Sequence, residues 1–206
     1  MDAEVTGTVR GLEILPSVFP KAGTQSGVSK GRKTCYRFSE VWKFMDDNFS
    51  EDVIYMRMAL REAERAAEAG EVPCGAIIVK DGAIIGKAHN QTELLKDPTA
   101  HAEILAITQA AAALENWRLT DAVMYVTKEP CPMCAGAIVL ARLKKVVWAV
   151  DDPKRGGARS KFEILDHADL NHRVEIQTGV MEAECKGLIQ GFFRERRKEN
   201  KTAETD

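Results

Sequence analysis

The sequence carries no large excess of charge of either sign. Its 206 residues include 29 Lys and Arg against 31 Asp and Glu, which gives a formal net charge of −2. Proteins that bind nucleic acid over a broad surface have a clear excess of Lys and Arg. Any contact between this chain and nucleic acid is therefore expected to be local.

Long apolar runs are missing as well. No apolar stretch approaches the roughly 20 residues that a membrane-spanning helix needs. The first residues also lack the basic segment followed by an apolar one that marks a secretory signal. The sequence thus gives no support for a membrane role. Its 45% of hydrophobic residues can build one sizeable core, so a globular domain is expected.

Cysteine is scarce, with five residues in the chain. The number is odd, and Cys131 and Cys134 form a C-x-x-C pair, which is typical of metal binding or redox chemistry rather than of a disulfide framework. We therefore expect reduced thiols and a cytoplasmic location. Cys35, Cys74 and Cys185 are expected to be free thiols.

Residues 1–44 differ in composition from the rest of the chain. They contain five of the fifteen glycines and follow no helical or strand period, which predicts a disordered extension. Met45 stands just before the first helical pattern, so a start site at Met45 or a non-native addition are alternatives to a native extension. A targeting peptide is less favoured, because Asp2, Glu4 and Glu13 do not suit an acid-poor transit sequence.

Regular patterns begin at residue 51. Ser50 is a suitable N-cap for a first helix, and Gly70 is a suitable residue just beyond its C-terminus. Segment 75–88 is predicted to form two strands joined by the turn Asp81-Gly82. Further along, the patterns predict a polar loop over 90–99, helices over 100–114, 132–142 and 182–198, and strands over 122–127, 145–150 and 173–177.

Strands that alternate with helices predict an α/β protein. The expected architecture is a three-layer α/β/α domain with a mixed, mostly five-stranded central sheet. We place this domain at residues 45–198 and expect residues 199–206 to form a disordered tail.

Two short motifs carry the chemistry. His101 and Glu103 lie in T-A-H-A-E, and Cys131 and Cys134 lie in E-P-C-P-M-C. One imidazole and two thiolates suit Zn²⁺ and leave its fourth tetrahedral position open for water. The carboxylate of Glu103 is then placed to move protons. The pattern H-x-E with P-C-x-x-C is the signature of hydrolytic zinc deaminases.

The expected helix starts support this interpretation. Cys131 and Cys134 flank Pro132 at the beginning of a helix, where free N–H groups favour thiolates. His101 and Glu103 can serve one metal only in an irregular first turn, for which Thr99 is a possible cap.

The alternative is a structural zinc site. Such a site is closed by a fourth protein ligand. The candidates for this ligand are His89, His167, His172, Cys74 and Cys185.

Over residues 50–197 the chain resembles the bacterial tRNA-specific adenosine deaminases of the cytidine deaminase superfamily. The stretches that carry the resemblance are V-P-C-G-A-I-I-V, D-P-T-A-H-A-E-I-L-A-I, N-W-R-L, Y-V-T-K-E-P-C-P-M-C-A-G-A-I, D-P-K-R-G-G-A, L-N-H-R-V-E-I, G-V-M-E-A-E-C and F-F-R-E-R-R. The resemblance implies a cytidine-deaminase-like fold and a homodimer with one zinc per subunit and no organic cofactor. The implied reaction is hydrolytic deamination of the wobble adenosine in a tRNA anticodon loop to inosine, with Glu103 as proton carrier.

The resemblance also implies substrate contacts. Asn90 matches the asparagine that contacts the target nucleoside, although a turn residue at the end of a strand would also explain it. Asp152, Lys154 and Asn171 match loop positions that touch anticodon nucleotides. A plain Asp-Pro turn and a helix cap would explain these three nearly as well.

The last predicted helix carries Phe193 and Arg194, followed by Arg196 and Arg197. Aromatic and cationic side chains of this kind can stack on bases and contact phosphates. A solvated helix end whose cations complement the helix dipole is the alternative for any single arginine.

Some positions depart from the family pattern. Lys128 stands where an aliphatic residue is usual, Val150 and Asp151 precede the Asp-Pro-Lys loop, and Arg159 replaces a small residue. These departures leave the substrate preference open. The rival functions are a free-base or nucleotide deaminase, of the guanine or cytosine type, and a non-catalytic RNA-binding module stabilised by zinc.

Overall fold

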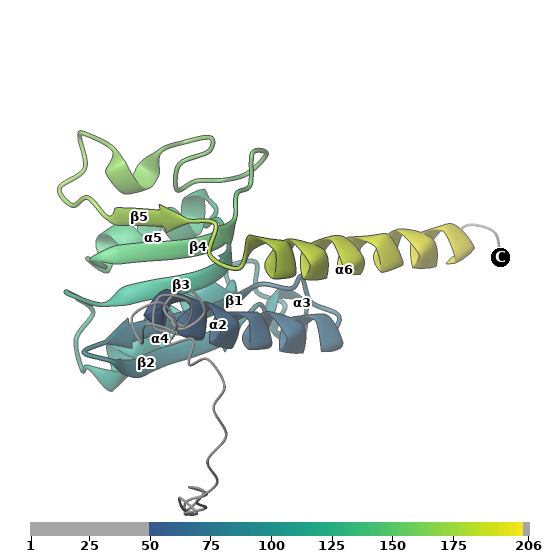
Figure 1. The fold of residues 1–206 in the computed structure, drawn as a ribbon, viewed down its shortest axis with the longest axis horizontal. Coiled ribbons are helices and arrows are strands. Elements are labelled where there is room, and N and C mark those ends of the chain that lie inside the picture. Colours follow the sequence, from purple (N-terminus) through teal and green to yellow (C-terminus); the bar gives the residue numbers. More distant parts are fainter. Residues whose placement is uncertain (1–49, 204–206) are drawn as a thin grey trace, which may run out of the picture. The chain divides into compact units, whose positions relative to one another are not determined.

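The computed structural model describes residues 50–203 (Figure 1). The predicted disordered extension over 1–44 lies outside these residues. The described elements are α2 (Glu51–Glu68), β1 (Gly75–Lys80), β2 (Ala83–His89), α3 (Thr92–Leu95), α4 (Ala102–Ala113), β3 (Val123–Lys128), α5 (Pro132–Leu140), β4 (Lys145–Val150), the 3-10 helix η1 (Ile164–Asp166), β5 (Glu175–Thr178) and α6 (Glu182–Ala203).

The five strands form one mixed sheet in the order β2-β1-β3-β4-β5. Strand β1 runs antiparallel to both of its neighbours, whereas β3, β4 and β5 are parallel to one another. This arrangement confirms the predicted fold class.

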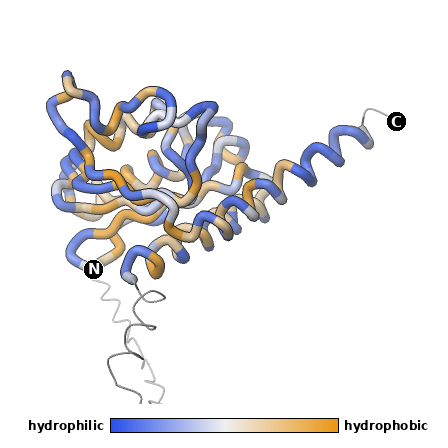
Figure 2. Tube along the Cα trace, turned by 45° about the horizontal axis from the view of Figure 1, so that its top comes forward, coloured by the Kyte–Doolittle hydropathy of each residue, from blue (hydrophilic) through white to orange (hydrophobic). Residues whose placement is uncertain are grey.

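Helices cover both faces of the sheet, which is why the central strands are apolar at nearly every position. In β1, Ala76 and Ile78 pack in a core with Ala106 of α4 and Ile138 of α5. Ile77 and Val79 face the other way and pack with Met56 and Ala59 of α2 and Cys185 of α6. Figure 2 shows the hydrophobic colour concentrated in the strands, while the last turns of α6 are hydrophilic. The domain therefore has the three layers expected from the sequence.

Local signals set the first helix and the hairpin as predicted. The Ser50 hydroxyl accepts a hydrogen bond from the Val53 N–H, and Gly70, just past α2, has a φ of +76°. Asp81 and Gly82 both have positive φ, at 50° and 76°. Positive φ at both central residues is the requirement of the type I′ turn that joins tightly paired strands.

The bounds of several elements differ from the sequence prediction by one or two residues. Three differences bear on the site or on the C-terminus. The segment predicted as a polar loop over 90–99 contains the short helix α3, whose Leu94 N–H donates to the distant carboxylate of Glu71. Helix α4 begins at Ala102 with His101 as its N-cap residue, whereas the predicted cap, Thr99, hydrogen-bonds Asp97 instead.

The third difference lies at the C-terminus. Helix α6 continues to Ala203, so residues 199–203, predicted as a disordered tail, are helical. Side-chain pairs one turn apart, such as Lys198 with Glu195, support these last turns. Residues 204–206 of the predicted tail lie outside the described residues. Between residues 50 and 203, no helix combines the length and the apolar character required to cross a membrane.

Close packing of α2 on β1 yields a stability prediction. A Cβ added at Gly75 would lie 2.1 Å from the Ala59 carbonyl oxygen and 2.5 Å from the Ala63 nitrogen, both backbone atoms. Gly75→Ala is therefore expected to lower the free energy of unfolding by about 1–3 kcal/mol or more. Urea unfolding followed by circular dichroism measures this loss.

Gly187→Ala is the control for this experiment. Gly187 lies within α6, and an added Cβ there meets no atom within 4 Å. This control is expected to keep or raise the unfolding free energy, by up to about 1 kcal/mol. Equal unfolding midpoints for Gly75→Ala and the wild type would contradict the packing argument.

Candidate active site

The predicted metal ligands come together in the folded domain. His101 Nδ1 lies 3.4 Å from Cys134 Sγ and 3.6 Å from Cys131 Sγ, and the three atoms all lie within 4.8 Å of one another. Tetrahedral zinc with usual bond lengths to sulfur and nitrogen would hold such atoms about 3.5 Å apart. The donor set and its spacing therefore fit a tetrahedral zinc ion.

A fourth protein ligand is absent from this group among residues 50–203. His89 faces the carboxylate of Glu62, and His172 Nε2 lies 2.7 Å from the Leu143 carbonyl oxygen. Cys185 belongs to the core between the sheet and α2. The described residues thus do not favour a closed structural site.

Two helix starts hold the ligands. His101 and Cys131 are the N-cap residues of α4 and α5, and both have extended backbone conformations. Pro132 occupies the first turn of α5, as predicted, and Cys134 follows two residues later. Because helix N-termini carry partial positive charge, both starts favour anionic sulfur.

The ligand side chains share charge and protons. A hydrogen bond from Cys134, assisted by one from His101, lowers the pKa of Cys131 to about 4 despite its burial. The same hydrogen bond to Cys131, together with burial, raises the pKa of Cys134. The hydrogen bond to Cys131 also raises the pKa of His101. These shifts favour a thiolate at Cys131.

Glu103 lies beside this group and is only 3% exposed. Burial raises the pKa of its carboxyl group above the ordinary value. A carboxyl group with a raised pKa can both accept and donate a proton near neutral pH. Its predicted role in proton transfer is therefore compatible with its surroundings.

A small pocket of about 170 Å³ opens beside the metal ligands. A pocket of this size can admit a base or a nucleoside but not a nucleic-acid helix. The residues that line it are Val72, Cys74, Asn90, Thr92, His101, Glu103, Lys128, Glu129, Cys131 and Arg155.

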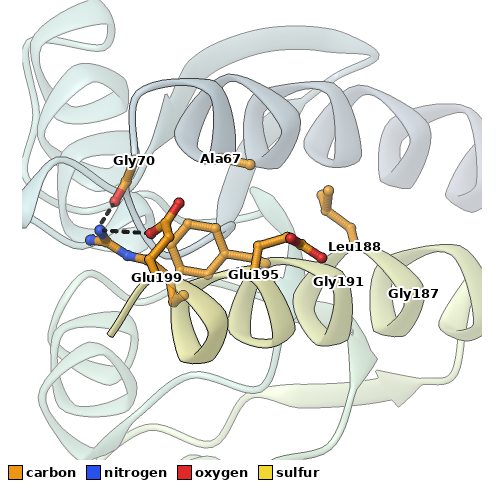
Figure 3. Close-up of a pocket in the computed structure, with 9 residues that line it drawn as sticks. Ala67, Gly70, Gly187, Leu188, Gly191, Glu195 and Glu199 are labelled. Atoms are coloured by element: carbon orange, nitrogen blue, oxygen red, sulfur yellow. Dashed lines mark hydrogen bonds and ion pairs between the residues drawn. The ribbon is translucent and has the colours of Figure 1, made fainter. Parts of the chain in front are cut away.

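A larger cavity of about 660 Å³ lies elsewhere, between the end of α2 and α6 (Figure 3). Its lining is mainly apolar and contains no His or Cys, so it is not the candidate reaction site.

Residues 151–160 form a loop that is held against the pocket by Glu129. The carboxylate of Glu129 accepts hydrogen bonds from the backbone N–H groups of Asp152, Arg159 and Ser160, at 2.8–2.9 Å, and from the Ser160 hydroxyl. A Cβ at Gly157 would lie 2.3 Å from the Pro132 nitrogen, so glycine permits the loop to approach the start of α5.

Lys128, which departs from the family pattern, has a defined partner. Its ammonium group forms an ion pair with the Asp152 carboxylate. Burial would raise the pKa of Asp152, but the hydrogen bond and charge of Lys128 lower it overall. The other Asp152 oxygen accepts from the backbone N–H groups of Lys154 and Arg155. Lys128 thus links the end of β3 to the loop.

The predicted substrate contacts are only partly brought together. Asn90 lines the pocket, and Asp152 adjoins it through Lys128. Phe193 of α6 lines a neighbouring hollow that shares Val72 and Thr92 with the pocket.

The other three predicted contacts do not line the metal pocket. Lys154 is exposed on the loop, and Arg194 lines a separate hollow on α6. Asn171 accepts hydrogen bonds from the guanidinium group of Arg142.

Sequence reasoning missed several residues of the pocket. Glu129, which lines the pocket, and Glu71, which accepts a hydrogen bond from the lining residue Asn90, were not singled out, although each is a carboxylate next to an apolar segment, which is a usable signal of a buried acid. Arg155 carried no such signal, since nothing local distinguishes it from other surface residues. Cys74 was considered only as a fourth zinc ligand and not as part of the pocket wall.

Comparisons with known proteins agree with the geometry. Residues 50–197 match the family described as MafB19-like deaminase. The tRNA-specific adenosine deaminase of Bacillus subtilis (strain 168) is 49% identical over 154 residues, which cover 75% of this chain and 96% of that protein. The tRNA-specific adenosine deaminase of Aquifex aeolicus (strain VF5) is 52% identical over 143 residues, covering 69% and 94%.

A solved structure is also similar. It was determined in studies of A-to-I editing by tRNA:A34 deaminases at the wobble position of transfer RNA. The TM-score is 0.64 at 41% identity, and the match covers 66% of this chain and 98% of that chain.

The loop carboxylate offers a test. Glu129→Gln leaves one oxygen where two now accept, so at least one buried backbone N–H loses its acceptor. We expect a loss of about 1–3 kcal/mol in the free energy of unfolding, measured by urea unfolding. The exposed Glu175 provides the control, since Glu175→Gln should change stability little. A Glu129→Gln protein as stable as this control would show that the loop does not depend on the carboxylate.

Proposed function

This chain belongs to the MafB19-like deaminases and, among them, resembles the tRNA-specific adenosine deaminases so closely that we propose the same reaction for it, the conversion of the wobble adenosine of a tRNA anticodon loop to inosine. It is an adenosine deaminase, a hydrolase of a C–N bond. The proposal has two further parts: the protein binds a zinc ion, and the adenosine that it deaminates is at the wobble position. The observation that carries it is the group of His101, Cys131 and Cys134 with the buried Glu103 beside one small pocket.

His101 Nδ1 and the sulfurs of Cys131 and Cys134 would hold the zinc ion. When bound, zinc would supply the Lewis acidity that makes a water molecule a stronger nucleophile at neutral pH. The two thiolates would compensate its charge, and the start of α5, which carries both cysteines, keeps them in place.

Glu103 carries the protons of the reaction. Its carboxylate takes one proton from the water molecule that attacks C6 of adenine and delivers it to ring N1. It then moves the second proton of that oxygen, now bonded to C6, to the amino group, which leaves as ammonia while C6 becomes a carbonyl carbon. Burial keeps the pKa of Glu103 raised, so the carboxyl group can hold a proton between these steps.

An anticodon loop suits a small pocket that must receive a single base. Its bases are already unstacked, so little pairing energy has to be overcome. A net charge of −2 is then tolerable, provided that cations gather near the pocket. Lys128 and Arg155 line it, and the neighbouring hollow contains Phe193 and Arg197.

The other predicted substrate contacts lie outside the pocket. Asp152 and Lys154 on the loop, Asn171 beyond it and Arg194 on α6 would touch nucleotides around the target rather than the target itself. The free-base deaminase is the weaker alternative, because it leaves the hollow between α6 and the pocket without a use. We also place the reaction in the cytoplasm, as the reduced cysteines suggest.

A homodimer is part of the proposal. Helix α5 contains no charged residue, yet only one side of it is buried in the single chain. Met133 and Leu140, seven residues apart, are 37% and 72% exposed on one side of the helix, and the position of Gly136 between them is open. A helix that is apolar all round is expected to be covered, and a second copy of this chain is the partner we propose.

The reaction is tested with the zinc-loaded protein and an anticodon stem-loop that carries adenosine at the wobble position. Glu103→Gln should abolish inosine formation and keep about one zinc per subunit, since it removes only the proton carrier. Cys131→Ser should lose both zinc and activity, because it removes a ligand. Liquid chromatography of digested RNA measures inosine, and plasma mass spectrometry measures zinc.

One variant and three free compounds serve as controls for this assay. Cys185→Ser changes a buried cysteine away from the ligands and should keep zinc and activity. Free guanine, adenosine and cytidine are offered separately. Turnover of a free compound without turnover of the stem-loop would overturn the assignment, and full activity of Glu103→Gln would refute the mechanism.

The dimer is tested by changing α5. Leu140→Lys puts a charge on its apolar side and should shift the protein toward the monomer in sedimentation velocity experiments, since an unpaired charge at an apolar interface is costly. Glu64→Lys, at an exposed position of α2, serves as the control and should leave the molecular mass of the assembly unchanged. A wild-type monomer would refute this part of the proposal.

A further inference from the structure

Glu71 is a buried carboxylate that the proposed mechanism does not use. It follows Gly70 at the end of α2, is 2% exposed, and forms no ion pair with any described residue. Its partners are neutral groups of segment 90–94. Glu71 Oε2 accepts from Asn90 Nδ2 and from the Thr92 hydroxyl, both at 3.1 Å, and Oε1 accepts from the Leu94 N–H at 2.8 Å.

Such an arrangement is costly. Removing a carboxylate from water without a cation beside it is unfavourable, and only hydrogen bonds offset the loss. Burial alone would raise the pKa of Glu71, but the hydrogen bonds from Leu94, Thr92 and Asn90 lower it overall, so the group is ionised at neutral pH. A glutamine or an apolar residue would avoid most of this cost, which points to a use for the negative charge.

The charge fixes which way the Asn90 side chain points. An ionised carboxylate accepts hydrogen bonds and cannot donate them, so only the amino end of the Asn90 carboxamide can face Glu71. The second hydrogen of that amino group reaches the Thr92 hydroxyl oxygen, which in turn donates to Glu71. Every donor in this ring of three side chains therefore has one possible direction.

The oxygen of the Asn90 carboxamide is the end of the side chain that remains available to the pocket. Asn90 Oδ1 accepts no hydrogen bond from the residues of the described domain, 50–203. No fully buried side-chain oxygen or nitrogen in this range lacks a partner, so Oδ1 remains accessible. Asn90 lines the metal pocket, and Oδ1 is thus the atom it offers there.

We infer that Glu71 is a positioning residue that locks the Asn90 carboxamide with its oxygen toward the pocket, so that the site recognises a hydrogen-bond donor of the target nucleoside. The inference rests on the proposed function, which supplies the nucleoside. The free ring nitrogens of adenine are acceptors. The possible hydrogen-bond donors of the adenosine are therefore the exocyclic amine of the base and the 2′-hydroxyl of the ribose. Recognition of the 2′-hydroxyl would also separate RNA from DNA.

Segment 70–72 is itself held from a second side. The Arg196 guanidinium group of α6 donates to the Gly70 carbonyl oxygen at 3.2 Å, an interaction drawn in Figure 3. Val72 lines both the metal pocket and the hollow beside Phe193. Glu71 therefore sits where α2, α6 and the wall of the pocket meet, and its carboxylate has little freedom to move.

The test uses the zinc-loaded, full-length protein and the anticodon stem-loop. In Glu71→Gln, the new amide cannot accept from both Leu94 and Asn90, and its amino end can turn the Asn90 carboxamide around. We expect kcat/KM for inosine formation to fall at least about 10-fold, the worth of one lost hydrogen bond, with zinc content unchanged. Glu62→Gln, which alters a buried glutamate of α2 outside the pocket, should retain wild-type kinetics.

A matched double variant separates positioning from mere stability. In Glu71→Gln combined with Asn90→Asp, the amide at position 71 can accept from Leu94 and donate to the carboxylate at position 90, whose second oxygen faces the pocket. We expect this swap to recover most of the kcat/KM lost in Glu71→Gln. Wild-type kinetics of Glu71→Gln, or a loss that the swap does not recover, would overturn the inference.

A deoxy substrate and the variant Asn90→Ala complete the experiment. A stem-loop with 2′-deoxyadenosine at the target position identifies the donor. If the 2′-hydroxyl is that donor, the deoxy substrate slows the wild type and slows Asn90→Ala no further, and an equal effect on both assigns the exocyclic amine. A wild-type protein that forms no inosine refutes the proposed function, whereas an active wild type matched by Glu71→Gln refutes only the role of Glu71.

Discussion

The close approach of two helix starts is the constraint on which the site depends. Helices α4 and α5 cover the same face of the sheet, and their N-cap residues, His101 and Cys131, have extended backbones that turn their side chains toward each other. Helix α4 also packs closely on the sheet. A Cβ at Gly86 of β2 would lie 2.4 Å from the Ala106 carbonyl oxygen, so α4 lies almost directly on the strand.

Glu103 and Glu129 are buried carboxylates that line the pocket, and a third, Glu71, accepts hydrogen bonds from the lining residues Asn90 and Thr92. Their surroundings suit them to different roles. Glu129 accepts backbone N–H groups of the 151–160 loop, and Glu71 accepts donors of segment 90–94. Both are acceptors that fix polypeptide segments in place. Burial dominates at Glu103 and raises its pKa, which suits a group that exchanges protons. The same chemical group thus holds polypeptide segments in two cases, and in the third its surroundings suit the proton transfer that we propose.

Much of the fold could be predicted because its signals are local. Ser50, Gly70 and Pro132 mark helix ends by their own conformational preferences, and Asp81-Gly82 marks the hairpin turn. Helix α3 escaped prediction because one of its N–H groups is satisfied by Glu71, 23 residues away in sequence. The end of α6 was placed too early because the polar composition of its last turns does not distinguish an exposed helix from a tail.

The sequence by itself determined which residues could form the site, since His101, Glu103, Cys131 and Cys134 are identified by residue type and by their places at predicted helix starts. Tertiary structure alone decided how the pocket is shaped. It placed Lys128 against Asp152, closed the loop on Glu129, and turned the amino end of the Asn90 carboxamide toward Glu71. These features depend on contacts between residues 19 to 31 positions apart in the sequence. No local preference records such contacts, because they form only when the sheet brings the segments together.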